Sequence, residues 1–175
     1  FIEDPGQEGK WMARQHHDYQ RSGNPVGYYA PDMEPQVDQG NTFILAHKNV
    51  KNPLISEKML VDDVIYEVNW EGDIVWEWAC NDHFEEMNFS EEAKNILFRN
   101  PTMVINPGLV GDWMHMNSMS LLGPNRFYDA GDKRFHPDNI IWDGRQTNIT
   151  AIIDKKTGKI VWQIGPDYNT SPEIK

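Results

Sequence analysis

The stretch "VIYEVNWEGDIVWEW" (residues 64–78) decides the fold, because it returns as "ITAIIDKKTGKIVWQI" (residues 149–164) with one extra turn residue. Gly72 aligns with Gly158, 86 residues later. Each copy has the pattern of a β-hairpin, in which two apolar strands flank a tight turn that contains glycine. A hairpin that recurs in this way predicts the blades of a β-propeller, which repeat about every 40–50 residues.

An offset of 86 residues equals two ordinary blades or one blade with a long insertion. The insertion is favoured, because the segment between the two hairpins contains the one helix that the sequence predicts. Ser90 suits the N-cap, Glu91 and Glu92 suit the first turn, and Pro101 stops the helix. We therefore expect one short helix at about residues 90–99.

Short runs of β-branched and aromatic residues, separated by Gly, Asn, Asp and Pro, predict the strands. They lie at residues 24–30, 41–48, 63–69, 73–79, 113–120, 138–144, 148–154 and 159–165. These strands supply only about two or three blades, whereas a closed propeller needs about four to eight. We therefore predict an all-β domain over residues 1–175 without an internal boundary. It would be part of a propeller, incomplete at both ends, with the remaining blades from the same longer chain or from another chain.

The bulk composition excludes several classes of function. The formal net charge of −11 argues against a nucleic-acid partner, which requires a basic surface. No run of about 18 apolar residues is present, so no membrane span is predicted. The single cysteine, Cys80, excludes a disulfide within the chain.

The stretch "GDWMHMNSMS" (residues 111–120) contains the first candidate site residues. Read as a strand with period two, it places Trp113, His115 and Asn117 on one face. A histidine beside an amide on such a face forms either a hydrogen-bonded polar network in the core or the edge of a ligand site.

Two further stretches offer polar groups of the same kind. In "RQHHDYQ" (residues 14–20), Asp18 could orient His16 or His17, although a histidine pair at the surface is an alternative. The spacing fits no HExxH or Cys/His template, so no metal ion is predicted. In "WDGRQTN" (residues 142–148), Arg145 presents a guanidinium suited to carboxylate, phosphate or sulfate oxygens, or to an acidic side chain of the protein. His47, His83 and His136 have no such pattern, and His136 is interpreted as structural.

Taken in order, these stretches resemble successive blocks of the bacterial arylsulfotransferase (aryl-sulfate sulfotransferase) family over about residues 11–166. The distinctive series is "DW-x-H-x-NS", then "R-Q-x-N", then "D-x-x-TG-x-IVW-x-IG". The last block is weak alone, because quinoprotein propellers have a similar hairpin. A quinoprotein-like binding propeller and a non-catalytic propeller scaffold therefore stay open as alternatives.

The resemblance implies a six-bladed propeller, usually exported to the periplasm, that works without cofactor or metal. It implies transfer of a sulfuryl group from a phenolic sulfate ester to a phenol through a sulfated histidine. Matched by motif, His17, His115 and Arg145 would be catalytic, whereas His16 (the fallback for His17) and Asn117 would contact the substrate. The sulfated histidine has no match here, so we expect it beyond Lys175 and the segment alone to be inactive. A homo-oligomer is possible.

Overall fold

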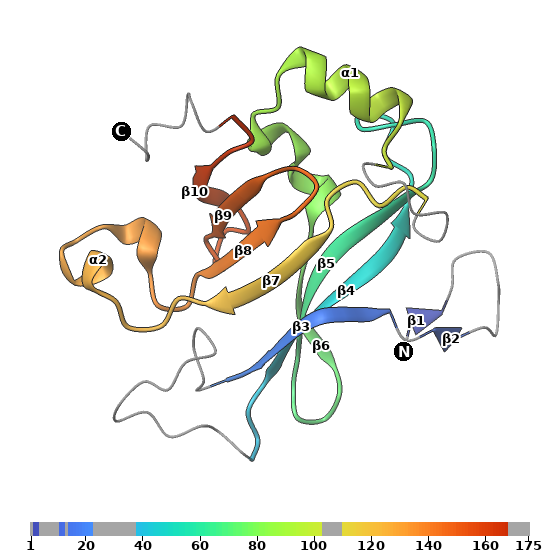
Figure 1. Cartoon of the computed structure of the whole chain (residues 1–175). Helices are drawn as coiled ribbons and strands as arrows, with labels where there is room; N and C mark the ends of the chain where they lie inside the picture. Colours follow the sequence, from blue (N-terminus) through green and yellow to red (C-terminus); the bar gives the residue numbers. More distant parts are fainter. Residues whose placement is uncertain (1, 4–10, 13, 23–37, 103–109, 168–175) are drawn as a thin grey trace.

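The computed structural model describes residues 2–3, 11–12, 14–22, 38–102 and 110–167, and shows a mostly β protein (Figure 1). The strand expected at residues 24–30 lies outside this part of the chain. Two antiparallel sheets of four strands each account for most of the structure, and short helices accompany them. Two short strands, β1 (Ile2–Glu3) and β2 (Trp11–Met12), pair separately.

Each large sheet is a meander in which strands adjacent in the chain are hydrogen-bonded neighbours. The first sheet contains β3 (Gln15–Arg21), β4 (Thr42–Val50), β5 (Leu60–Val68) and β6 (Ile74–Ala79). The second contains β7 (Met116–Leu121), β8 (Ile140–Gly144), β9 (Ile149–Ile153) and β10 (Ile160–Ile164). Apart from residues 24–30, all the expected strands are confirmed. Most bounds agree within a few residues, but β7 begins three residues late.

The repeated hairpin occupies the same place in both sheets. The pairs β5–β6 and β9–β10 are the third and fourth strands of their meanders, so the offset of 86 residues leads from one sheet to the next. The segment between the sheets contains η2 (Cys80–Met87) and α1 (Glu91–Arg99). The favoured long insertion is therefore confirmed, whereas the interpretation of each four-stranded unit as a propeller blade stays a prediction.

Helix α1 begins and ends where the sequence predicts. The Ser90 hydroxyl accepts a hydrogen bond from the backbone N–H of Ala93, as an N-cap does. The expectation of a single helix was nevertheless incomplete, because α2 (Arg126–Asp129), η3 (Lys133–Phe135) and η2 are also present. These elements are too short or too irregular to show a helical period in the sequence. Within the described residues, no helix is long and apolar enough to cross a membrane.

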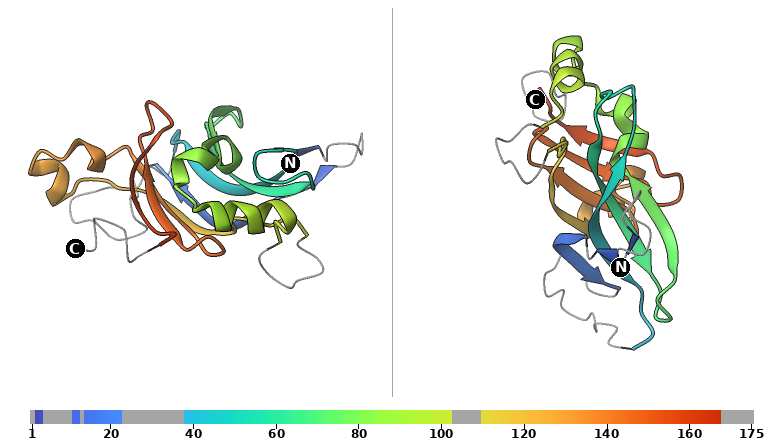
Figure 2. Two further views of the ribbon diagram at one scale, coloured as in Figure 1. Left: turned by 90° about the horizontal axis from the view of Figure 1, so that it is seen from above. Right: turned by 90° about the vertical axis from the view of Figure 1, so that its right-hand side faces the viewer.

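The hydrophobic core fills the space between the two sheets. Phe43, Leu45 and Ile65 come from the first sheet, whereas Trp142 and Ile153 come from the second. Figure 2 shows the two sheets from above and from the side, with α1 at one end of the molecule. The core therefore fixes the two meanders against each other and determines which strands face one another.

The two sheets meet along their first strands, β3 and β7, which lie side by side without a backbone ladder between them. Side chains of β3 satisfy the backbone of β7 instead. Asp18 Oδ2 accepts from the N–H of Met119 at 3.1 Å, and Gln20 Oε1 accepts from the N–H of Leu121 at 2.8 Å. The edge of one sheet is thus tied to the edge of the next.

A second link joins the outer strand of the first sheet to the hairpin turn of the second. The indole Nε1–H of Trp78, which is buried, donates to the carbonyl oxygen of Gly158 at 2.7 Å. Nearby, Lys155 forms an ion pair with Glu67 at 2.7 Å. A tryptophan of the first hairpin, Trp78, is therefore bound to the turn glycine of the second hairpin, Gly158.

We predict that Trp78→Phe lowers the free energy of unfolding by about 1–3 kcal/mol, since it removes this hydrogen bond and part of a buried ring. Chemical denaturation measures the change. Trp70→Phe is the matched control, because Trp70 is 53% exposed and its replacement should change stability by less than about 0.5 kcal/mol. Equal effects of the two substitutions would show that the link contributes nothing.

Candidate functional site

Four histidines gather where the two sheets meet, and we call them the histidine cluster. His16 and His17 lie on β3, His47 lies on β4, and His115 directly precedes β7. The ring of His115 lies 5.1 Å from that of His17, 6.2 Å from that of His16 and 6.3 Å from that of His47, between centroids. Residues up to 99 positions apart in the chain thus share one site.

The closest contact in the histidine cluster joins the two sheets. Nε2 of His17 lies 3.0 Å from Nε2 of His115, so one of these nitrogens carries the hydrogen that the other accepts. On the far side of the ring, Nδ1 of His115 lies 2.5 Å from Oδ2 of the buried Asp112. A carboxylate at this position holds the proton on Nδ1, so neutral His115 accepts from Nε2–H of His17.

Both imidazoles are aimed by an unusual backbone conformation. His17 has a φ of 51° and His115 a φ of 54°, in the left-handed region that residues other than glycine seldom adopt. Register shifts accompany them, between Gln15 and Tyr19 in β3 and between Met116 and Ser118 in β7. Strain of this kind is characteristic of functional sites, where the surrounding structure holds it in place.

This conformation overturns the expected alternation of Trp113, His115 and Asn117. Residues 113–115 precede the strand, and the left-handed turn at His115 breaks the period of two. Trp113 is buried in the core, whereas Asn117 is half-buried on β7. In the described part of the chain, no hydrogen bond ties the Asn117 side chain to the histidine cluster.

The segment before His115 is anchored to β5. The indole Nε1–H of Trp113 donates to Oδ1 of Asp62 at 2.9 Å, and Oδ2 of the same carboxylate accepts from the side chain and backbone N–H of Asn81. Burial raises the pKa of Asp62 to about 7, although these three donors oppose the rise. A backbone bond from Val61 N–H to Gly111 carbonyl completes the anchor.

Gly111 makes this close approach possible. It has a φ of 89°, and a Cβ atom at this position would collide with the carbonyl oxygen of Met59. A glycine is therefore required immediately before Asp112, the residue that orients His115.

Arg145 lies beside the His17–His115 pair. Its backbone N–H donates to the carbonyl of His115 at 3.0 Å, and that of Gln146 donates to the carbonyl of Met114 at 3.1 Å. The "R-Q-x-N" turn thus packs directly on the "DW-x-H" segment. The Arg145 side chain is exposed, and its guanidinium has no ion pair among the described residues. Desolvation, the nearby imidazoles of His16 and His115, and the charge of Arg145 lower the pKa of His17.

The other two imidazoles face a buried carboxylate. Nε2 of His16 and Nε2 of His47 lie 3.0 and 3.5 Å from Oδ1 of Asp63, which is fully buried, and their rings stack with centroids 3.7 Å apart. Burial and the neighbouring His16 and His115 lower the pKa of His47 to about 3, whereas burial raises the pKa of Asp63. The suggested role of Asp18 is wrong, because its oxygens accept from the backbone of Tyr19 and Met119.

The sequence predicted that four of these residues belong to one site: His16, His17, His115 and Arg145. It did not predict that His47, Asp63 and Asp112 also belong to it. Asp112 could have been found, because it lies three residues before His115 in the same motif. His47 and Asp63 gave no local signal, since they meet only through the pairing of β4 with β5.

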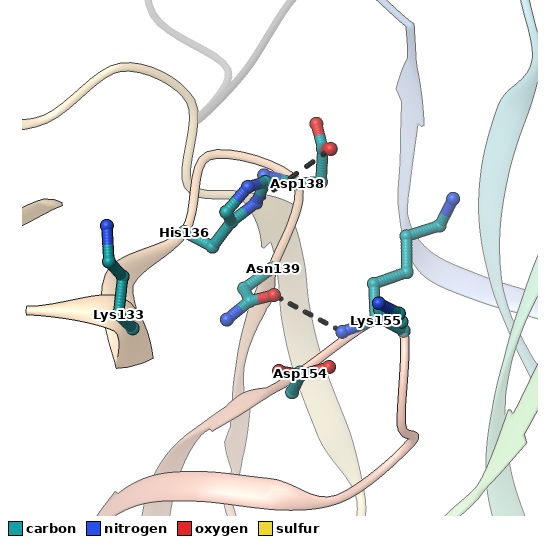
Figure 3. A pocket seen from close by; sticks show the side chains of 7 residues that line it. Lys133, His136, Asp138, Asn139, Asp154 and Lys155 are labelled. Atoms are coloured by element: carbon teal, nitrogen blue, oxygen red, sulfur yellow. Dashed lines mark hydrogen bonds and ion pairs between the residues drawn. The ribbon is translucent and has the colours of Figure 1, made fainter.

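The remaining histidines lie elsewhere. His83 stacks on Trp78 and contacts Glu86. His136 lines a separate pocket of about 420 Å³, which Figure 3 shows. Its labelled residues are Lys133, His136, Asp138, Asn139, Asp154 and Lys155. Asn139 and Arg145 flank opposite ends of β8, about 20 Å apart along an extended strand, so this pocket is distinct from the histidine cluster.

Comparison with known proteins identifies a family. A family model described as "Arylsulfotransferase (ASST)" matches residues 32–174, which include His47, Asp63, Asp112, His115 and Arg145. The match begins after β3. In the structure, however, His16 and His17 of β3 contact two matched residues, Asp63 and His115. No match was found among curated proteins or among solved structures.

We predict that His115 carries its proton on Nδ1 in the wild-type protein and that Asp112→Asn removes this preference. Nitrogen NMR of the imidazole resolves the two tautomers. Asp138→Asn is the matched control, because Asp138 is exposed and contacts His136 instead. A wild-type His115 with its proton on Nε2 would contradict the assigned role of Asp112.

Proposed function

The chain belongs to the arylsulfotransferase family, and from this we propose that it takes part in transferring a sulfuryl group from a phenolic sulfate ester to a phenol. The observation that carries the proposal is the contact between His17 and His115 at the junction of the sheets, with the exposed Arg145 bonded through its backbone to His115. Two imidazoles and a planar cation provide the donors that a sulfate ester and its departing phenoxide require.

Arg145 supplies the positive charge in this proposal. The chain carries a net charge of −11, so its overall field repels an anionic substrate. A guanidinium without an acidic partner in the described structure is free to neutralise two sulfuryl oxygens at once. Its backbone bond to His115 fixes the turn from which the side chain extends.

In this proposal the His17–His115 pair transfers a proton to the departing phenoxide. In this step His115 has first taken up a proton from solvent at Nε2. Sulfur exchanges its bond to the bridging phenolic oxygen for a bond to the nitrogen of the sulfated histidine, and the departing phenoxide takes the Nε2 proton of His115. Asp112 stabilises the His115 imidazolium from which that proton leaves. In the second step the incoming phenol returns a proton to the same nitrogen as its oxygen attacks sulfur and the sulfur–nitrogen bond breaks. The bond and proton changes therefore balance over one cycle.

In our proposal the sulfuryl group passes through a sulfated histidine, as in the family that the sequence resembles. No residue of this chain matches that histidine by motif, so His17, His115 and Arg145 are given assisting roles only. Asn117 is proposed to contact substrate, whereas His16, the fallback for His17, faces Asp63 with both ring nitrogens buried. Splitting the transfer into two steps would give ping-pong kinetics.

We also propose that the two meanders are blades of a six-bladed propeller, located in the periplasm or otherwise exported. Two observations support the propeller: each meander has four strands in chain order, and the first strands of neighbouring sheets lie side by side. The site would then lie on the innermost strands, where several blades converge. A homo-oligomer is compatible with this arrangement.

We predict that His115→Ala and Arg145→Ala each lower the rate of sulfuryl transfer at least about 100-fold in the full-length protein, the scale of losing one preorganised donor. Release of a chromogenic phenolate from its sulfate ester, with and without a phenol acceptor, measures the rate. Arg145→Lys should restore only part of it, because an ammonium lacks the planar donor fork.

Matched controls are His136→Ala and Arg99→Ala, which remove the same groups from a half-buried and an exposed position away from the histidine cluster. Both should transfer at the wild-type rate. Unchanged turnover in the Arg145 variant would remove that residue from the mechanism. A full-length protein that transfers nothing would favour the propeller scaffold.

A further inference from the structure

We propose that His16, His47 and Asp63 form a binding site for a divalent transition-metal ion of the zinc class. The three residues come from three neighbouring strands, β3, β4 and β5, and His47 lies directly opposite Asp63 in the register. Backbone pairing therefore holds His47 opposite Asp63, whereas His16 lies in the register shift of β3. One of the three residues, His16, is the neighbour of His17 on β3.

The donor atoms converge at distances that suit one ion. Nε2 of His16 and Nε2 of His47 lie 3.0 and 3.5 Å from Oδ1 of Asp63, and all three donor atoms lie within 4.8 Å of one another. With metal–ligand bonds of about 2.1 Å, these two separations correspond to angles of about 90° and 110° at the ion. Such angles fit tetrahedral and octahedral coordination.

The same atoms are only partly satisfied inside the protein. Both oxygens of Asp63, both ring nitrogens of His16 and Nε2 of His47 are buried. Besides His16, the backbone N–H of Met116 interacts with the Asp63 carboxylate. Asp63 is completely buried, and no lysine or arginine among the described residues forms an ion pair with it. A buried carboxylate facing two imidazole nitrogens is costly by itself and is satisfied by a cation.

The ligand types select the class of ion. Two imidazoles with one carboxylate suit zinc and similar first-row ions, whereas calcium and magnesium prefer oxygen ligands. His47 also belongs to a second group, with Asp112 and His115, but those two residues already bind each other. We therefore place the ion at His16, His47 and Asp63.

Binding requires a small movement of the two rings. The imidazoles of His16 and His47 are stacked, with 20° between their planes, whereas the lone pair of each nitrogen lies in the plane of its own ring. The rings must therefore tilt apart to share one ion. An ion so bound would tie β3, with its left-handed His17, to the rest of the first sheet. No short sequence motif predicts this site, because His16 and His47 are 31 residues apart in the sequence and His47 and Asp63 are 16 apart.

The test is metal binding by the full-length protein after dialysis against a chelator. Calorimetric titration with Zn²⁺ should show one ion per chain, and Co²⁺ should give visible absorption bands of a site with nitrogen and oxygen ligands. Asp63→Asn and His47→Gln should each weaken binding at least about 100-fold. His83→Ala and His136→Ala should bind as the wild type does.

Circular dichroism of the metal-free variants separates loss of a ligand from loss of the fold, and His16→Gln replaces any variant that does not fold. Absence of saturable Zn²⁺ and Co²⁺ binding by the wild type would overturn the proposal. So would wild-type affinity in folded variants of Asp63 and His47. Because the readout is binding, its outcome is independent of sulfuryl transfer.

Discussion

The contact of 3.0 Å between Nε2 of His17 and Nε2 of His115 is the interaction on which the functional account depends. It is made across two separate sheets, so it exists only if the core, the β3–β7 junction and the anchoring of residues 111–115 are all in place. Asp18 and Gln20 fix β3 against β7, while Asp62 fixes Trp113. The left-handed backbone at both histidines then turns the rings toward each other.

The positive charge available to an anionic substrate comes from a few side chains of the site and not from the net charge of the chain. In an acidic chain, the exposed side chain of Arg145 supplies positive charge next to His115, to which its backbone is bonded. Behind these groups lie the buried carboxylates of Asp112 and Asp63. Asp112 is used directly, because it orients His115. Asp63 faces His16 and His47 instead, which is why a cation beneath the site is chemically reasonable.

Much of the fold could be predicted from the sequence, because the repeated hairpin carries strong local signals. Gly72 and Gly158 both adopt a positive φ, as the turns require, and Ser90 caps α1. The approach of His17, His115 and Arg145 could be expected only through resemblance to a family. Periodicity misplaced Trp113, because a left-handed residue two positions later leaves no mark in the sequence. The pairing of His47 with Asp63 depends on strand register, which local patterns do not fix.

The most direct test of the central claim is an NMR titration of the imidazole resonances with an aryl sulfonate, a stable analogue of the aryl sulfate. The account predicts saturable shifts at His17 and His115 with one affinity, whereas the resonances of His83 and His136 stay in place. Titration without a response at His17 and His115, or with equal responses at all of these histidines, would contradict a substrate site at the junction of the sheets.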